Sequence, residues 1–276
     1  MSSVPSILGL IAGNGAYPFV MAAGARRAGV PRLVAAAFEN ETRAELSGVV
    51  DDIEWMRVGQ LSRMSKFFRR HGAAHAVMVG QIAPKNLFDL RPDMRTLIML
   101  AKLKERNAES IFGAIADELA KDGITLLPAT TFLESDMAPA GHIAGPVLKA
   151  KDMADADFGL KIARETSRLD IGQTVVVRRG TVLAVEAFEG TNECIRRGGS
   201  FGKGQATMVK VSKPGQDMRF DVPVVGTQTI DTAAAAGIRL IAVEAGRTLL
   251  LERESVLRLC QERGVTLAGV LPGGPA

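Results

Sequence analysis

Two aspartates, Asp217 and Asp221, lie four residues apart in a segment interrupted by proline and glycine, residues 213–230. Residues an even number apart in an extended chain share a face, so both carboxylates are expected to point to one side. Mg²⁺ is typically held by one or two carboxylates together with phosphate oxygens. The pair is therefore a candidate Mg²⁺ site. Thr227 lies just before a predicted helix and is a candidate substrate contact. The alternative is two surface aspartates in a loop.

A Gly-x-Gly turn follows an apolar run in the segment LIAGNGAYP, residues 10–18. The N–H groups of Gly13, Asn14 and Gly15, together with a helix dipole, are suited to a phosphate. A dinucleotide-binding fingerprint needs a third glycine three residues after the second, and Pro18 occupies that position. The turn indicates a phosphate or nucleotide site, with a purely structural turn as the alternative.

A second loop with polar residues follows the predicted strand in VMVGQIAPKN, residues 77–86. The strand is expected to end at Gly80, and Gln81 and Lys85 follow it. Ligands of open parallel sheets bind beyond the carboxyl ends of the strands, so both loops are expected at one sheet edge. Gly80, Gln81 and Lys85 are therefore candidate phosphate contacts.

A third candidate site lies where a predicted strand gives way to a helix, residues 185–197. Glu189 is placed at this junction, and Thr191 is a plausible helix N-cap. Arg196 and Arg197 add positive charge near the predicted anion-binding helix start. A carboxylate at such a junction is a candidate acid or base, although carboxylates near strands are usually solvated.

The elements that position these residues follow an alternating pattern in the first half of the chain. Strands alternating with helices predict a mainly parallel sheet wound on both faces, a Rossmann-like domain over residues 1–130. The expected strands are 6–13, 31–38, 52–59, 75–82 and 124–129, and the expected helices 17–29, 61–72 and 93–121.

The second half predicts a mixed α/β domain over residues 148–276. Its clearest signal is a β-hairpin within 173–190, in which two β-branched runs flank an Arg-Arg-Gly turn. The intervening residues 131–147 have no sustained period and are expected to form a linker or hinge. Segment 219–226 is expected to be extended and broken by Pro223. The fold class is thus α/β with two lobes, whose sites would meet in a cleft.

Composition narrows the functional class. The 276 residues are 47% hydrophobic and 23% charged, which is typical of a globular protein. The net charge of +4 is spread along the chain and aromatics are scarce, which disfavours nucleic-acid binding. Cys194 and Cys260 are far apart and are expected to be reduced, buried thiols. No signal peptide or long apolar run is evident, so we expect a cytoplasmic protein.

Four motifs together resemble the LpxI family, the UDP-2,3-diacylglucosamine pyrophosphatases of lipid A biosynthesis. They are LGLIAGNGAYP, VMVGQI, AVEAFEGTNECIRRGG and DMRFDVPVVGTQTI, in order along the chain. The resemblance implies hydrolysis of UDP-2,3-diacylglucosamine to UMP and 2,3-diacylglucosamine 1-phosphate (lipid X). It also implies Mg²⁺ dependence, two domains closing over the substrate, and attack of water on the sugar-side phosphorus. One departure is Asn192, where the family pattern has an aspartate, so this residue cannot act as a base or an anionic ligand.

The resemblance also implies roles for the candidate residues. Asp221 is the first choice for Mg²⁺ ligand or water-positioning base, followed by Glu189 as a catalytic group and Asp217 as a metal ligand. The expected substrate contacts are Gly13, Asn14, Gly15, Gly80, Gln81, Lys85, Thr191 and Thr227. A diacylated substrate resides in a membrane, so peripheral contact with the inner face of the cytoplasmic membrane is expected. The sequence is compatible with a homodimer.

Two other functions stay open at this point. An NAD(P)-dependent oxidoreductase would use the same opening turn, and Glu39 follows the second predicted strand where a ribose-binding acid is expected. A non-catalytic binding protein for a nucleotide-sugar lipid would bind without turnover. That function would leave Asp217 and Asp221 without a chemical task.

Overall fold

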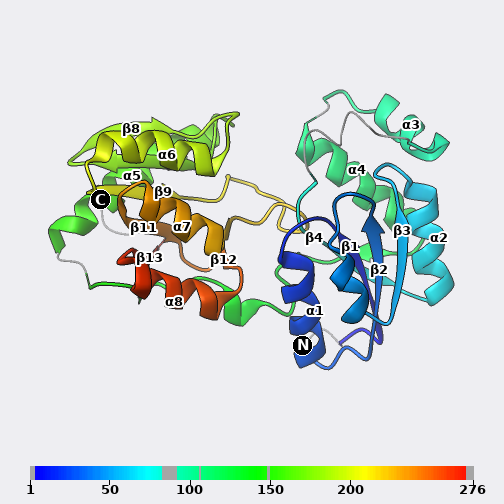
Figure 1. The fold of residues 1–276 in the computed structure, drawn as a ribbon. Coiled ribbons are helices and arrows are strands. Elements are labelled where there is room, and N and C mark those ends of the chain that lie inside the picture. Colours follow the sequence, from blue (N-terminus) through cyan, green and yellow to red (C-terminus); the bar gives the residue numbers. More distant parts are fainter. Residues whose placement is uncertain (1–3, 83–91, 106, 148–149, 272–276) are drawn as a thin grey trace. The chain divides into compact units, whose positions relative to one another are not determined.

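A computed structural model describes residues 4–82, 92–105, 107–147 and 150–271 (Figure 1). Contacts between Cα atoms divide the chain into two compact units. Unit 1 comprises Met1–Glu134 and the short returning segment Asp217–Asp221. Unit 2 comprises Ser135–Gln216 and Val222–Ala276.

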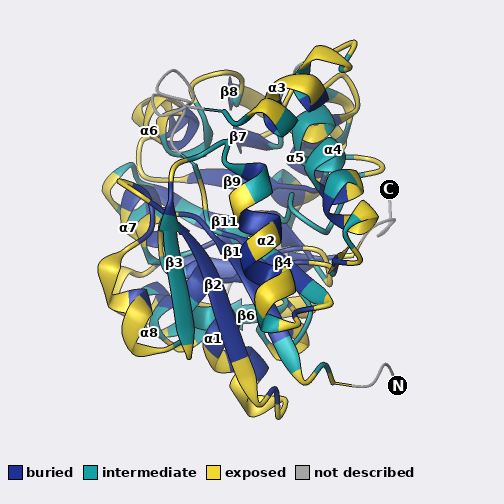
Figure 2. Ribbon diagram, turned by 90° about the vertical axis from the view of Figure 1, so that its right-hand side faces the viewer, coloured by how far each residue is buried: buried dark blue, intermediate teal, exposed yellow. Residues whose placement is uncertain are grey.

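Unit 1 is built on a parallel five-stranded sheet in the order β3-β2-β1-β4-β5. The central strands β1 and β2 are almost entirely buried (Figure 2), as expected of parallel strands covered on both faces. The predicted parallel sheet is therefore confirmed. The strands are β1 (Ile7–Ala12), β2 (Arg32–Phe38), β3 (Asp52–Met56), β4 (His75–Val79) and β5 (Thr125–Leu126).

The helices of unit 1 are α1 (Tyr17–Arg27), α2 (Leu61–His71), α3 (Met94–Ala101) and α4 (Ala108–Lys121), with a 3₁₀ turn at Ala44–Gly48. The single helical region expected over residues 93–121 is wrong, because two helices occupy it. The Asp93 side chain accepts a hydrogen bond from the backbone N–H of Thr96 and caps α3. Asn107 caps α4 in the same way, through Ser110. Each cap starts a new helix.

The returning segment 217–221 is held to the rest of unit 1 by a backbone hydrogen bond and by an aromatic contact. The N–H of Ala129 donates to the carbonyl of Met218 at 2.8 Å. The rings of Phe112 and Phe220 lie 5.6 Å apart. A piece of the second half of the sequence therefore belongs to the first folded unit.

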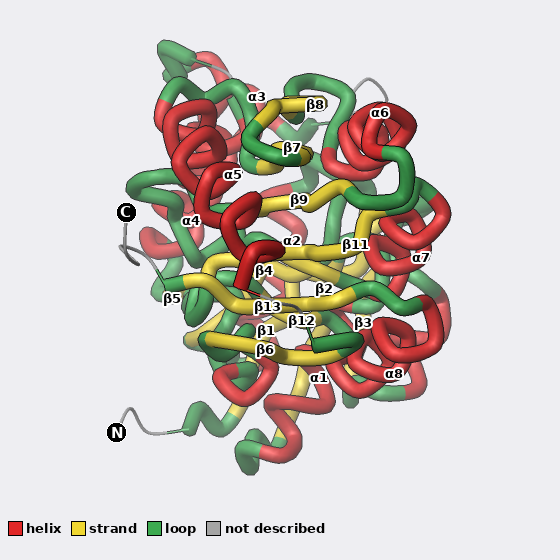
Figure 3. Tube along the Cα trace, turned by 90° about the vertical axis from the view of Figure 1, so that its left-hand side faces the viewer, coloured by secondary structure: helices red, strands yellow, loops and turns green. Residues whose placement is uncertain are grey.

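Unit 2 contains a mixed six-stranded sheet in the order β6-β13-β11-β9-β7-β8 (Figure 3). Parallel pairing joins β13, β11 and β9, and antiparallel pairing joins β6 to β13, β7 to β9 and β8 to β7. The predicted hairpin is confirmed as β7 and β8. The strands are β6 (Gly141–Ala144), β7 (Thr174–Arg178), β8 (Thr181–Val185), β9 (Ala206–Lys210), β11 (Ile238–Glu244) and β13 (Thr266–Val270), with a separate parallel pair of β10 (Val224–Val225) and β12 (Leu249–Leu250).

Helices cover both faces of this sheet. On one face, buried side chains of α5 (Ala150–Arg168) pack against β7, β9 and β11. On the other, α6 (Thr191–Gly202), α7 (Thr227–Ala235) and α8 (Arg253–Arg263) share a second core with the sheet. Cys194 and Cys260 lie in this second core as free thiols, and burial raises their pKa values to about 12 and about 11.

Part of the segment expected as a linker is regular structure. Residues 134–136 form a 3₁₀ turn, and β6, within 131–147, is an edge strand of the unit 2 sheet paired with β13. Short strands with two flanking glycines give too weak a period to be recognised in the sequence. No helix in the described part of the chain is long and apolar enough to span a membrane.

Candidate functional site

The two loops predicted at one edge of the unit 1 sheet do meet. The N–H of Gly13 donates to the carbonyl of Val79 at 2.8 Å. Asn14 and Gln81 form an isolated antiparallel bridge, with N–H···O distances of 2.7 and 3.2 Å. The carboxyl ends of β1 and β4 are therefore joined through the backbone directly beyond the strands.

Close approach of these loops explains two of the glycines. A Cβ atom on Gly13 would lie 2.6 Å from the carbonyl oxygen of Gln81, and one on Gly80 would lie 2.7 Å from that of Asn14. Gly80 also has a φ of +95°, a conformation that favours glycine. Gly15 has a φ of +91° but open space around it, so only its backbone conformation requires glycine there.

The three N–H groups of this turn all have acceptors within the protein. Gly13 donates to Val79 at the end of β4, Asn14 donates to Gln81, and Gly15 donates to the side-chain oxygen of Asn14 at 2.6 Å. A phosphate bound at residues 13–15 would have to displace at least one of these hydrogen bonds. In this conformation Gly13 serves loop packing, and Gly15 serves the turn through its backbone conformation.

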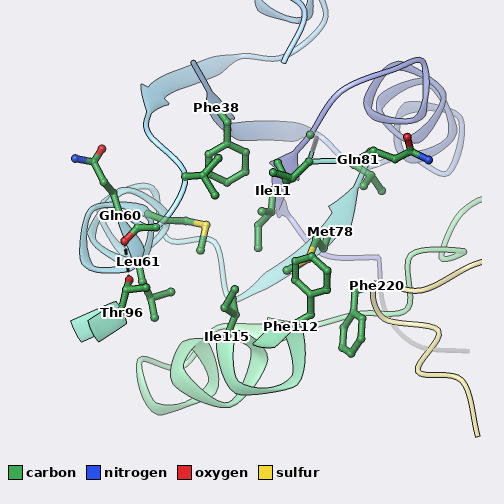
Figure 4. Close-up of a pocket in the computed structure, with 17 residues that line it drawn as sticks. Ile11, Phe38, Gln60, Leu61, Met78, Gln81, Thr96, Phe112, Ile115 and Phe220 are labelled. Atoms are coloured by element: carbon green, nitrogen blue, oxygen red, sulfur yellow. Dashed lines mark hydrogen bonds between the residues drawn. The ribbon is translucent and has the colours of Figure 1, made fainter. Parts of the chain in front are cut away.

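Beside these loops lies a pocket of about 560 Å³, which we call the apolar pocket (Figure 4). Its volume is within the range typical of small-molecule sites. It lies at the carboxyl ends of β1, β2 and β4, where ligands of parallel sheets usually bind. Its wall is mostly apolar and includes Ile11, Phe38, Met78, Phe112, Ile115 and Phe220.

Polar groups in the apolar pocket are few. Gln60, Gln81 and Thr96 are among its lining residues, but the amide groups of Gln60 and Gln81 extend away from the other lining side chains (Figure 4). The Thr96 hydroxyl donates to the carbonyl of Gly59 at 2.6 Å. Of the residues predicted for substrate binding, Gly13, Gly80 and Gln81 lie in its wall. Sequence inspection missed its apolar members, because such residues are indistinguishable from core residues without the fold.

The segment with Asp217 and Asp221 is a turn, so the expectation of an extended chain is wrong. The N–H groups of Phe220 and Asp221 both donate to the carbonyl of Asp217, at 3.2 and 3.0 Å. This i to i+4 geometry replaces the strand geometry from which a shared face was expected. Asp221 is half-buried in the turn.

The Asp217 carboxylate is bound by Arg219. The guanidinium Nε and terminal nitrogen donate to both carboxylate oxygens at 2.6–3.0 Å, and the backbone N–H of Arg219 adds a further bond at 3.0 Å. The side-chain hydrogen bond from Arg219 holds the pKa of Asp217 below its usual range. To bind a metal ion, the Asp217 carboxylate would have to give up its ion pair with Arg219.

In unit 2, Glu189 lies in the loop before α6. Its carboxylate accepts a hydrogen bond from the N–H of Ala187 at 3.1 Å and forms an ion pair with Arg197. Hydrogen bonds from backbone N–H groups and from Arg197 hold the pKa of Glu189 below its usual range. Glu189 is therefore an exposed, ionised carboxylate at neutral pH.

Thr191, the first residue of α6, is the centre of a polar cluster. Its hydroxyl donates to Glu186 at 2.8 Å and accepts from the ammonium of Lys210 at 2.8 Å. Thr174, which pairs with Lys210 in the sheet, lies 3.4 Å from the same hydroxyl. The second carboxylate oxygen of Glu186 is buried without a hydrogen-bond partner.

Lys210 was missed in the sequence. It is the last residue of β9 and is more than nine-tenths buried. Lysine is almost never buried so deeply unless it is paired. The signal available in the sequence was a lysine closing the apolar run of a strand. That pattern usually denotes an exposed strand end.

Two of the remaining predicted residues, Asn192 and Thr227, lie at the starts of helices. Asn192 is in the first turn of α6. The N-cap of this helix is Gly190, with a φ of +83°, so the prediction of Thr191 as the N-cap is wrong by one residue. Thr227 is the first residue of α7, following Gly226. Lys85 lies outside the described residues. Within the described ranges, no three His, Cys, Asp or Glu side chains gather as a metal-binding group.

Fold and site together define a class: a two-domain α/β protein with an apolar pocket in one domain and a charged helix start in the other. Family models describe each domain, the LpxI N-terminal domain over residues 7–135 and the LpxI C-terminal domain over residues 139–268. The chain therefore belongs to the LpxI family.

A curated relative from Caulobacter vibrioides, UDP-2,3-diacylglucosamine pyrophosphatase LpxI, is 34% identical over 280 residues, covering 96% of this chain and 98% of the relative. Among solved structures, the biotin carboxylase domain of Hydrogenobacter thermophilus 2-oxoglutarate carboxylase aligns at 16% identity with a TM-score of 0.27. That alignment covers 63% of this chain and 35% of the other, and a score this low carries no argument.

Proposed function

We propose that this protein hydrolyses the pyrophosphate bond of UDP-2,3-diacylglucosamine, releasing UMP and 2,3-diacylglucosamine 1-phosphate (lipid X). The observation that carries this proposal is the similarity to the Caulobacter pyrophosphatase over nearly the whole of both chains. The name of the Caulobacter protein states that it is a UDP-2,3-diacylglucosamine pyrophosphatase. Extension to this chain is reasonable because both LpxI domains are matched here.

The apolar pocket supports a lipid substrate. A pocket with a largely aliphatic and aromatic wall suits a hydrocarbon chain, because burying such a chain removes apolar surface from water. Gln81 and Gly80 lie at the edge of the pocket nearest the joined loops. We propose that an acyl chain occupies the pocket and that the polar part of the substrate lies toward Asn14 and Gln81.

Asp221 is the proposed metal ligand and water-positioning residue. Bound Mg²⁺ would neutralise charge on the phosphate oxygens, and it needs only one or two protein carboxylates. Asp221 is half-buried, so part of the residue is exposed to solvent, where Mg²⁺ and a phosphate would bind. Asp217 fits less well as a second ligand, since Arg219 binds both of its oxygens.

In unit 2, Glu189 and Thr191 are proposed to contact the substrate. The ionised Glu189 carboxylate can accept a proton or orient a water molecule, while Thr191 begins a helix with no side-chain cap. The helix start supplies a positive potential for phosphate oxygens, whereas Lys210 is buried and bound to Thr191. Asn192 supplies an amide at the position where the family pattern has an aspartate. Thr227 is proposed as a further substrate contact.

The test is an assay for UMP release from detergent-dispersed UDP-2,3-diacylglucosamine. We expect hydrolysis that stops when a chelator removes divalent cations and recovers when Mg²⁺ is restored. Hydrolysis that persists undiminished in excess chelator would exclude the metal-dependent mechanism. Tight substrate binding with no UMP release would instead favour a non-catalytic lipid-binding protein.

A parallel titration with NADH and NADPH addresses the oxidoreductase alternative. We expect no saturable binding, because Pro18 stands where dinucleotide binding needs a glycine. Saturable binding in the low micromolar range would overturn the proposal. Hydrolysis in ¹⁸O-labelled water identifies the phosphorus attacked, and we expect the label in lipid X.

A further inference from the structure

Helix α3 of unit 1 presents an apolar face to solvent. Met94, Leu97 and Ile98 have relative exposures of 71%, 47% and 50%, and Ala101 is also exposed. These four residues have the spacing i, i+3, i+4 and i+7, which places them on one side of a helix. We call these four residues the α3 stripe. Surface helices normally turn such a stripe toward the core, so its exposure requires an explanation.

The opposite side of α3 fixes the orientation of the α3 stripe. Thr96 and Met99 are buried, and the Thr96 side chain lines the apolar pocket. Arg95 joins α3 to α4 through an ion pair with Glu118 at 2.8 Å and a second with Asp122. With these contacts in place, α3 cannot roll to bury the α3 stripe without breaking them.

Positive charge accompanies the α3 stripe. From Met94 to Lys104 the chain carries three cationic residues and no carboxylate. Arg95 is used in the ion pairs with α4, whereas Lys102 and Lys104 are exposed just after the helix. The flanking Asp93 carboxylate accepts hydrogen bonds from Thr96 and Ser62, and Glu105 follows Lys104.

We propose that the α3 stripe, with Lys102 and Lys104, docks on an anionic phospholipid bilayer. Apolar side chains would enter the boundary between headgroups and acyl chains, and the lysines would be attracted to lipid phosphates. The inference rests on the proposed lipid substrate. It adds the surface that contacts the membrane: because Thr96 belongs to both α3 and the pocket wall, docking places the apolar pocket beside the lipid. A helix of two turns makes this binding weak and reversible.

The test is co-sedimentation of the full chain with vesicles of phosphatidylcholine containing roughly a third phosphatidylglycerol. We expect the double variant Leu97→Glu/Ile98→Glu to bind about tenfold less tightly or worse than the wild type. Lys102→Glu/Lys104→Glu should lose binding to these vesicles while leaving binding to pure phosphatidylcholine unchanged. Leu169→Glu is the matched control, since Leu169 is 59% exposed in unit 2, and it should bind as the wild type does.

Several outcomes would overturn the inference. The first is that the wild-type protein does not sediment with anionic vesicles. The second is that the Leu97→Glu/Ile98→Glu variant binds them as tightly as the wild type. The third is that the wild type is a dimer and this variant is a monomer. The last outcome would mean that a second copy covers the α3 stripe. UMP release in detergent separates this proposal from the proposed function, because the double variant should retain it. Vesicle binding without UMP release by the wild type would overturn the function and leave the docking surface standing.

Discussion

The loops beyond the strands of unit 1 and those of unit 2 use different chemistry. In unit 1, the Gly-x-Gly turn and the Gly80–Gln81 loop bind each other through backbone hydrogen bonds, and the pocket beside them is apolar. In unit 2, the corresponding region carries side-chain charges: Glu189 with Arg197, and Thr191 between Glu186 and Lys210.

The difference shows that a glycine-rich turn has no fixed purpose. Glycine in unit 1 allows two backbones to approach, as the Cβ positions at residues 13 and 80 demonstrate. Gly190 in unit 2 instead lets the chain enter α6 at a φ of +83° and leaves the first helical turn without a side-chain cap. In the unit 1 turn the backbone N–H groups already donate hydrogen bonds within the protein. In unit 2 the start of α6 has no side-chain cap and is available to an anion.

The largest expected effect concerns a side-chain charge, in contrast to the backbone contacts of the unit 1 loops. Asp221 brings a carboxylate to unit 1 on the returning segment. Asp221→Asn keeps the shape and removes the charge, so we expect the rate of UMP release at saturating Mg²⁺ to fall about 1,000-fold. Circular dichroism should be unchanged.

Asp231→Asn is the control for this substitution. Asp231 is an exposed aspartate paired with Arg263 at 3.0 Å, and its variant should keep its rate within about twofold of the wild type. An Asp221→Asn rate close to that of the control would remove Asp221 from the mechanism.

The second prediction tests whether loop packing requires glycine in unit 1. Gly80 and Gly15 have nearly the same positive φ, but only Gly80 faces backbone atoms of a neighbouring loop. We expect Gly15→Ala to lower the free energy of unfolding by about 1 kcal/mol through backbone strain alone. Gly80→Ala adds steric overlap and should lower it by about 3 kcal/mol.

Urea unfolding followed by tryptophan fluorescence measures both variants, because the single tryptophan, Trp55, lies in β3 of unit 1. Equal losses of unfolding free energy would mean that the loop contact is not what demands glycine at position 80.

The third prediction concerns the polar cluster of unit 2. Thr191→Val removes the hydroxyl that accepts from Lys210 and donates to Glu186. Because Glu186 and Lys210 would lose their shared hydrogen-bond partner, local stability should fall by about 2 kcal/mol. Hydrogen exchange of α6 amides measures that loss.

Thr191→Ser restores the hydroxyl and should recover most of the stability, which makes it the matched control. If the serine variant is as destabilised as the valine variant, the methyl group rather than the hydroxyl stabilises the start of α6.

Periodic features of this fold were predictable from the sequence. Buried parallel strands appear in the sequence as apolar runs, so the strands of unit 1 and the hairpin of unit 2 could be identified. The meeting of residues 13–15 with Gly80 and Gln81 also followed, because it depends only on where parallel strands end.

Features that depend on contacts distant in sequence were not predictable. The turn at 217–221 packs within unit 1, and its aspartates looked like part of an extended segment because Pro223 and Gly215 obscure any period. The role of Lys210 in the polar cluster could not be predicted without knowing that it is buried. The place of Phe112 and Phe220 in the pocket wall depends on the fold that brings their rings together. The break between α3 and α4 is a local feature, but its two caps lie within a long apolar pattern that predicts one continuous helix.

The smallest expected effect concerns the ion pair of Asp217 with Arg219. The pKa of Asp217 is lowered in the folded protein, so the pair contributes stability above the unfolded pKa of about 3.9 and loses it as pH falls through the folded value. Arg219→Met should therefore lower the free energy of unfolding by about 0.5–1 kcal/mol at pH 7, because solvent partly screens the pair.

The effect of the same substitution should shrink as pH falls through the lowered pKa of Asp217, because the protonated carboxyl no longer gains from the pair. Urea unfolding followed through Trp55 measures the difference across this range. Arg57→Met is the matched control in unit 1, since Arg57 pairs with Glu39 at 3.3 Å with both side chains exposed. Its effect should be smaller still, about 0.3 kcal/mol. An Arg219→Met effect that persists undiminished at low pH would instead assign the stabilisation to packing of Arg219 on the Phe220 ring, 5.8 Å away.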